Sequence, residues 1–173
     1  MIRRMKFSDA NDHGFTLVEL SIAIVISSIL VIVIGNMTIA TNQYFIKGMK
    51  QAGLQRDLAF LMEMLTNNVR EANANQSFVY EDSSKTDSGP IASNGTCIKL
   101  KIPERTVVYF KGQRDFVLNT QGGTKVRFVV DKIDTLLFTK TYLADSSCCV
   151  NIHLAMSESG HSLTGRQNVF FRN

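Results

Sequence analysis

The sequence predicts an α+β protein in which a long amino-terminal helix, transmembrane in its first half, packs through its second half on an antiparallel β-sheet. The first observation is an apolar run over residues 15–40 that carries a single acid, Glu19. The second is a helical spacing of apolar residues that continues to Ala72 without a proline. The third is a series of short alternating runs with turn signals over residues 97–173, typical of antiparallel strands.

The apolar run has the length of a membrane span. No charged side chain occurs from Leu20 to Ile46, and a bilayer core needs about 20 apolar residues in a helix. The run is longer than the core of a secretory signal, and no A-x-A cleavage site follows it. We therefore expect a retained span. Basic residues precede the span, which favours a cytoplasmic amino terminus, but others follow it: Arg3, Arg4 and Lys6 before, Lys47, Lys50 and Arg56 after.

Glu19 is unusual because a charged side chain is costly inside a membrane. If the chain is cut after Gly14, Phe15 becomes a free amino terminus, one helical turn before Glu19. Helical side chains point toward the amino terminus, so the carboxylate would reach its own amine or that of a neighbouring chain. The first alternative caps the helix, and the second sets the stagger between packed helices.

The residues Gly14–Leu20, "GFTLVEL", follow a short basic leader and precede the uncharged run. This arrangement resembles the class III prepilin signal of type IV pilins and type II secretion pseudopilins. The resemblance implies cleavage between Gly14 and Phe15 by a prepilin peptidase and N-methylation of Phe15. It also implies that Glu19, with Thr16 beside it, helps to dock the subunit into a fibre of other pilin or pseudopilin subunits.

On this basis the chain divides into five segments. They are a prepilin leader peptide at 1–14, a transmembrane and fibre-core helix at 15–40, the amphipathic half of that helix at 41–76, a polar loop at 77–96 and an antiparallel β domain at 97–173. We expect a single-pass protein of the bacterial inner membrane with a cytoplasmic amino terminus and a periplasmic carboxy-terminal domain, which then enters a pilus or pseudopilus.

The amphipathic half carries apolar residues at spacings of three and four, with polar residues largely between them. This stripe predicts packing against the domain, with Met62 and Met64 filling gaps. The stripe consists of Leu54, Leu58, Leu61, Leu65, Val69 and Ala72.

Downstream, Gly89-Pro90 and Asn94-Gly95 are turn signals in the polar loop. Six or seven strands are expected after the loop: "CIKLKI", "TVVYF", "DFVLN", "KVRFVV", "DTLLFTKTYL", "CVNIHLAM" and "QNVFFRN". In "KVRFVV", Val126, Phe128 and Val130 alternate with other residues, which predicts one apolar face.

This order of elements, closing on "VFFRN", resembles J-type minor pseudopilins and PilW-like minor pilins. The resemblance implies a minor subunit that primes or caps assembly of a type IV pilus or a type II secretion pseudopilus. The alternative is a fibre-tip binding module that contacts a surface, an exported substrate or DNA. The sequence leaves open which machine the subunit serves: pilus, type II secretion or DNA uptake.

The three cysteines show no CxxC spacing. In an exported domain, Cys97 can pair with Cys148 or Cys149, which leaves one thiol over. The simpler alternative is three reduced thiols. We expect a disulfide, with the pairing open.

No enzyme is predicted, because phosphate-loop, zinc-protease and nucleophile-elbow motifs are missing and only His153 and His161 remain after leader removal. No cofactor is expected. Calcium binding by the loop acids is an alternative to ordinary solvation, and DNA binding by a basic set with aromatic residues is less expected than a solvated face. The acids are Glu81, Asp82 and Asp87; the basic set is Lys99, Lys101, Arg105, Lys111 and Arg114, with Tyr109 and Phe110.

Overall fold

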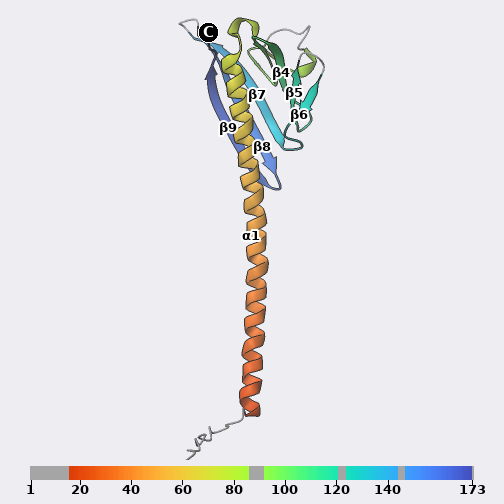
Figure 1. Ribbon diagram of the computed structural model, residues 1–173, viewed down its shortest axis with the longest axis vertical. Coiled ribbons are helices and arrows are strands. Elements are labelled where there is room, and N and C mark those ends of the chain that lie inside the picture. Colours follow the sequence, from red (N-terminus) through yellow and green to blue (C-terminus); the bar gives the residue numbers. More distant parts are fainter. Residues whose placement is uncertain (1–15, 86–91, 121–123, 144–146, 173) are drawn as a thin grey trace, which may run out of the picture. The chain divides into compact units, whose positions relative to one another are not determined.

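α1 is one α-helix of 55 residues, Leu17–Glu71 (Figure 1). The computed structural model describes residues 16–85, 92–120, 124–143 and 147–172. The chain divides into two units, residues 1–46 and 47–173, and α1 contributes to both. No proline interrupts the helix. Glu19 lies in its first turn and Arg70 in its last, which complements the helix dipole.

The helix ends earlier than the expected boundary at 76. Its last residue is Glu71, and a short 3₁₀-helix, η1 (Ala74–Gln76), follows. Asn73 accounts for this end: its side chain accepts a hydrogen bond from Asn75 N at 3.0 Å, and its own N–H donates to Lys101 O at 2.8 Å. An asparagine that bonds its own neighbourhood favours a turn over further helix.

In the first unit, every described side chain from 16 to 46 is exposed. By its length and composition, α1 is long and apolar enough to cross a membrane. Side-chain hydroxyls in this part bond the carbonyl one turn back, as Ser28 does to Ile24 O at 2.6 Å and Thr38 to Ile34 O at 2.9 Å. These hydroxyl groups therefore need no water as a hydrogen-bond partner.

In the second unit, the predicted stripe of α1 faces the core. Leu54, Leu61, Leu65 and Val69 have no exposed surface, and Leu58 is half-buried. Met62 and Met64 pack partly buried against the same cluster, as predicted for gap-filling side chains.

The strands are all antiparallel, as predicted, but the described residues form two sheets and not one. Strand pairing is set by contacts between segments far apart in sequence, which an alternating pattern does not encode. The five-stranded sheet has the order β1 (Phe78–Tyr80), β3 (Cys97–Ile102), β4 (Arg105–Lys111), β5 (Phe116–Thr120), β6 (Lys125–Arg127), and the four-stranded sheet β2 (Asn94–Gly95), β7 (Ile133–Tyr142), β8 (Cys148–Glu158), β9 (His161–Phe170).

The segment 77–96, which was expected to be a polar loop, contains β1, β2 and a second 3₁₀-helix, η2 (Ser83–Lys85). Asn94-Gly95 is not a turn, because it pairs with Thr139 and Phe138 of β7. A Cβ on Gly95 would lie 1.9 Å from Tyr80 O. Glycine is needed here because the backbone of β2 passes directly over the end of β1.

Two strand predictions differ at their ends. β6 stops at Arg127, and Val126 and Val130 are exposed instead of lying on a buried face. The last strand, β9, runs from His161 to Phe170, so it begins well before the predicted run "QNVFFRN". Ser159 and Gly160 have φ angles of 52° and 84°, which suit a tight hairpin turn.

The core of the second unit lies between the two sheets and α1. Tyr109 and Phe116 enter it from the five-stranded sheet, with ring centroids 5.6 Å apart. Phe138 and Ile152 enter from the four-stranded sheet with no exposed surface. Burial raises the pKa of the Tyr109 hydroxyl to about 12.

The expected disulfide is not formed: Cys97, Cys148 and Cys149 are free thiols. Cys97 lies in the five-stranded sheet, whereas Cys148 and Cys149 lie in the four-stranded one. Cys97 and Cys148 are both buried, and burial raises the pKa of the Cys97 thiol to about 12. The structure therefore agrees with the simpler alternative of reduced thiols.

Candidate functional site at the start of α1

The start of α1 is closed by a reciprocal pair of residues, Thr16 and Glu19. Glu19 Oε2 accepts hydrogen bonds from Thr16 N at 2.9 Å and Thr16 Oγ1 at 3.0 Å. The N–H of Glu19 donates back to Thr16 Oγ1 at 3.2 Å. This is a capping box, in which a threonine before the helix and a glutamate three residues later satisfy each other's backbone donors.

The capping box assigns Glu19 a local partner that the sequence analysis did not find. The self-capping alternative used the amine of Phe15, but here the donors are the amide and hydroxyl of Thr16. The spacing T-x-x-E in the sequence is a sufficient signal for this capping box. Gly14 and Phe15 lie outside the described residues, so the cleavage and methylation at these residues stay predictions.

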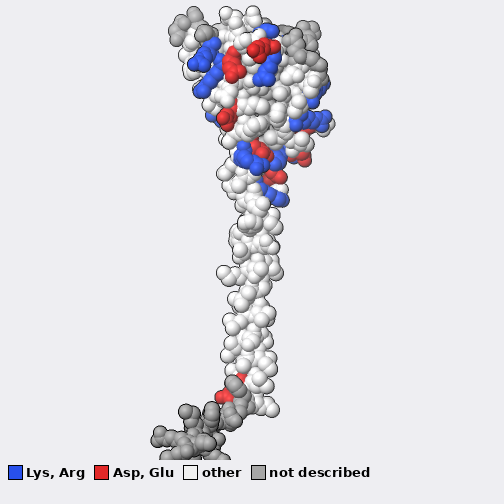
Figure 2. Space-filling view, in the orientation of Figure 1, with Lys and Arg blue, Asp and Glu red and all other residues white. Residues whose placement is uncertain are grey.

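Glu19 is also the only charged side chain among the described residues 16–46. Figure 2 shows the lysine, arginine and acidic side chains gathered on the part that carries the sheets, whereas most of the helix before that part is free of them. Before residue 47, the apolar side chains of α1 have no cover from the other described residues; for example, Leu17 is 85% and Val31 69% exposed. Such a surface suits lipid or other apolar helices.

The predicted basic set does not form one open face. Tyr109 is only 1% exposed, and its hydroxyl accepts a hydrogen bond from Asn68. Arg114 is ion-paired with Asp131 at 3.5 Å and with Asp134 at 3.1 Å. An arginine held by two carboxylates is less available to a phosphate.

The loop acids are only partly described. Asp82 Oδ1 accepts a hydrogen bond from Ser84 N at 2.6 Å, and the carbonyl of Glu81 accepts from Thr96 N at 3.2 Å. Asp87 lies outside the described residues. Calcium binding stays a prediction.

The histidines lie apart from the cysteines in the sheet register. His153 of β8 stands opposite Leu137 and Arg166, whereas Cys149 stands opposite Thr141 and Phe170. His161 pairs with Glu158 at the other end of the hairpin. These positions do not bring a thiol and an imidazole together as nucleophile and base.

A buried lysine is a feature that the sequence analysis missed. Lys140 is 8% exposed, and its Nζ donates to Ala74 O at 2.6 Å and to Ser77 O at 2.7 Å. Aromatic rings also surround the ammonium group at 5.1–5.6 Å: those of Phe78, Tyr142 and Phe171. Carbonyl oxygens and ring faces here take the place of a carboxylate. No sequence pattern indicated this, because the partners come from three separate segments.

Comparison with known proteins supports the assignment of the amino terminus. Residues 9–35 match the family described as the prokaryotic N-terminal methylation motif, the class III prepilin signal. Searches of curated proteins and of solved structures found no match. The matched residues contain the capping box and most of the uncharged run.

Proposed function

We propose that this chain, a type IV pilin-like protein by its amino-terminal motif and its α+β architecture, is a minor pilin or pseudopilin that primes or caps assembly of a type IV pilus or type II secretion pseudopilus. The observation that carries the proposal is the single carboxylate of Glu19 at the head of the uncharged, exposed part of α1 that precedes Lys47. A helix of this kind is stable only in lipid or among other apolar helices.

In this proposal, prepilin peptidase cleaves between Gly14 and Phe15, and Phe15 is then N-methylated. Cleavage creates an amine in an apolar setting, where a charge without a partner is costly. The carboxylate of a neighbouring Glu19 is a suitable partner. The capping box supports an exchange of this kind, because it holds Glu19 in hydrogen bonds with Thr16 until a stronger charged donor replaces them.

The minor role rests on the layout of the second unit. The cysteines do not bound a loop near the carboxy terminus, as they typically do in major pilins, and all three are free. The proposed location is the bacterial inner membrane, with the amino terminus in the cytoplasm and the second unit in the periplasm, before entry into the fibre.

The experiment compares Glu19→Ala with Glu63→Ala in cells that make the fibre. Glu63 is an exposed acid further along the same helix, so its replacement controls for the loss of one carboxylate. We expect both variants to insert and to be cleaved, but only Glu19→Ala to be lost from sheared fibres. Wild-type incorporation of Glu19→Ala would refute the docking role.

A separate variant tests processing. Gly14→Val should leave the precursor uncleaved, seen as a larger band on a blot of the membrane fraction. A mature band of unchanged size would overturn the assignment of the cleavage site while leaving the docking test intact.

A further inference from the structure

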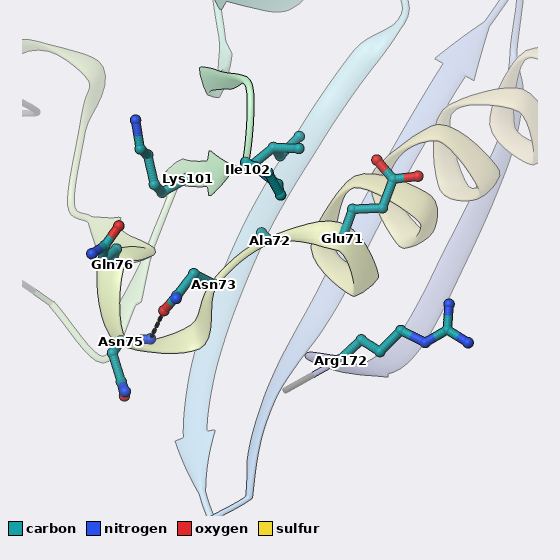
Figure 3. Close-up of a pocket in the computed structure, with 9 residues that line it drawn as sticks. Glu71, Ala72, Asn73, Asn75, Gln76, Lys101, Ile102 and Arg172 are labelled. Carbon is teal, nitrogen blue, oxygen red and sulfur yellow. Dashed lines mark hydrogen bonds between the residues drawn. The ribbon is translucent and has the colours of Figure 1, made fainter.

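A cleft lies in the second unit where α1 ends. Its volume is about 600 Å³, within the range of about 300–1,000 Å³ usual for ligand sites. The residues that follow the helix form one side and the end of β3 forms another, and Arg172 comes from the segment after β9 (Figure 3). The cleft is thus built from three segments that are distant in sequence.

The walls of this cleft are fixed by hydrogen bonds that backbone N–H groups donate. Asn73 N donates to Lys101 O at 2.8 Å, and Arg172 N donates to Arg70 O at 3.1 Å. Lys101 N donates to Ser77 Oγ at 3.1 Å. Because these bonds hold all three segments, a ligand would meet a site that is already formed, which lowers the cost of binding.

Lys101 and Arg172 supply two cationic side chains to the cleft. Among the residues that the structure describes, neither side chain has a hydrogen-bond or ion-pair partner. Figure 3 shows the two side chains on opposite sides of the segment Ala72–Asn73. The carbonyls of Val69 and Arg70 at the helix end are already hydrogen-bonded, to Ala72 N and Arg172 N. These carbonyl oxygens therefore compete less with an anionic ligand for the two cations.

Amide side chains and a small apolar floor complete the cleft. Asn73 uses its Oδ1 to accept from Asn75 N at 3.0 Å, which leaves its amide donors for a ligand. Gln76 supplies another amide, which can donate and accept at once, as a peptide group does. Ala72 and Ile102 are 1% and 6% exposed and form the floor.

We propose that this cleft binds an extended acidic peptide segment of a partner protein. Two separated cations suit two carboxylates along a chain, and the amides suit the peptide groups between them. A dense polyanion such as nucleic acid fits less well, because the exposed carboxylate of Glu71 lies in the lining. This site does not depend on Glu19 or on fibre assembly.

The test measures fluorescence anisotropy of the full chain in detergent micelles with a labelled, end-capped peptide, Gly-Glu-Glu-Gly-Glu-Gly. The matched peptide with glutamine in place of glutamate reports the contribution of charge. We expect Lys101→Gln with Arg172→Gln to weaken binding of the acidic peptide by about tenfold or more, because each loses a charge-assisted hydrogen bond. Glu71→Gln should have the opposite effect and tighten binding.

Lys125→Gln is the control, because this exposed lysine lies on β6 and outside the cleft lining. It should change the affinity less than about twofold, as expected for a distant exposed charge. Circular dichroism checks that all variants fold. The proposal fails if the acidic peptide does not bind, if the glutamine peptide binds equally well, or if the double variant binds like the wild type. Tighter binding of an oligogalacturonate than of the peptide would also overturn it, since the ligand would then be an acidic sugar.

Discussion

Thr16 and Glu19 hold each other at the start of α1: the threonine hydroxyl lies 3.0 Å from Glu19 Oε2, and the glutamate N–H lies 3.2 Å from the same hydroxyl. The acid that looked out of place in an apolar run thus serves as half of a helix cap. A carboxylate with local donors is less costly to carry into a membrane than an isolated one. Docking in a fibre would then be an exchange of partners for Glu19.

Replacing Thr16 by valine should loosen this cap while keeping the shape of the side chain. Loss of an N-cap hydroxyl costs about 0.5–2 kcal/mol. We therefore expect faster hydrogen exchange of the Glu19 amide in the full chain in micelles, measured by NMR. Thr16→Ser retains the hydroxyl and should exchange like the wild type. Equal exchange in all three proteins would show that the cap does not stabilise the first turn.

Lys140→Met should destabilise the second unit. The substitution leaves the carbonyls of Ala74 and Ser77 without their donor, and an unsatisfied buried polar group costs about 1–3 kcal/mol. Lys140→Arg keeps a charged donor and should lose less stability than Lys140→Met. Urea denaturation followed by near-ultraviolet circular dichroism measures both. A methionine variant as stable as the wild type would mean that water replaces the ammonium group.

Lys132 should make the free energy of unfolding depend on alkaline pH. Its Nζ lies 2.9 Å from Glu158 Oε2 and 3.0 Å from Asp57 Oδ2, and these hydrogen bonds, first that to Glu158, raise the pKa of the lysine above 10.5. The folded state therefore holds the proton more tightly than the unfolded chain. The stabilisation is complete below pH 10.5 and is lost as the pH rises through the folded-state value.

The measurement compares the wild type with Lys132→Met by urea denaturation across this range. Near neutral pH we expect a loss of about 0.2–1 kcal/mol for each partly exposed ion pair, and the difference should shrink above pH 10.5. Lys125→Met removes an exposed lysine that has no ion pair among the described residues, and it should show no such trend. A difference that stays constant with pH would contradict the assignment.

Alanine at two glycines should have opposite effects. At Gly95 the new Cβ would lie 1.9 Å from Tyr80 O, and overpacking costs about 1–3 kcal/mol or more. At Gly53, inside α1, nothing lies within 4 Å of the new Cβ, and alanine is the better helix former by about 0.8–1 kcal/mol. Thermal denaturation of both variants checks the signs. A neutral Gly95→Ala would mean that β2 can move away from β1.

The elements with a strong periodic pattern were predictable. The predicted burial of the stripe from Leu54 to Val69 is confirmed, because helical spacing alone decides which side chains share a face. The strand "CIKLKI" was correct to the residue, with Ile98, Leu100 and Ile102 buried on alternate positions. By contrast, β2 was not predicted, because its two residues, Asn94 and Gly95, show no alternation of apolar and polar side chains. Its partner β7 lies about forty residues away in the sequence.

Among the site residues, the sequence by itself determined those whose partners are close in the chain. The capping box needs only Thr16 and Glu19 within one turn, and the span needs only an uninterrupted apolar helix. The tertiary structure alone decided the surroundings of Lys140, the placement of Cys97 and Cys148 in different sheets, and the cleft between Lys101 and Arg172. The physical reason is the distance in sequence between the partners. A helix turn is set by neighbours three and four residues apart, whereas these arrangements form only after both sheets have packed on α1.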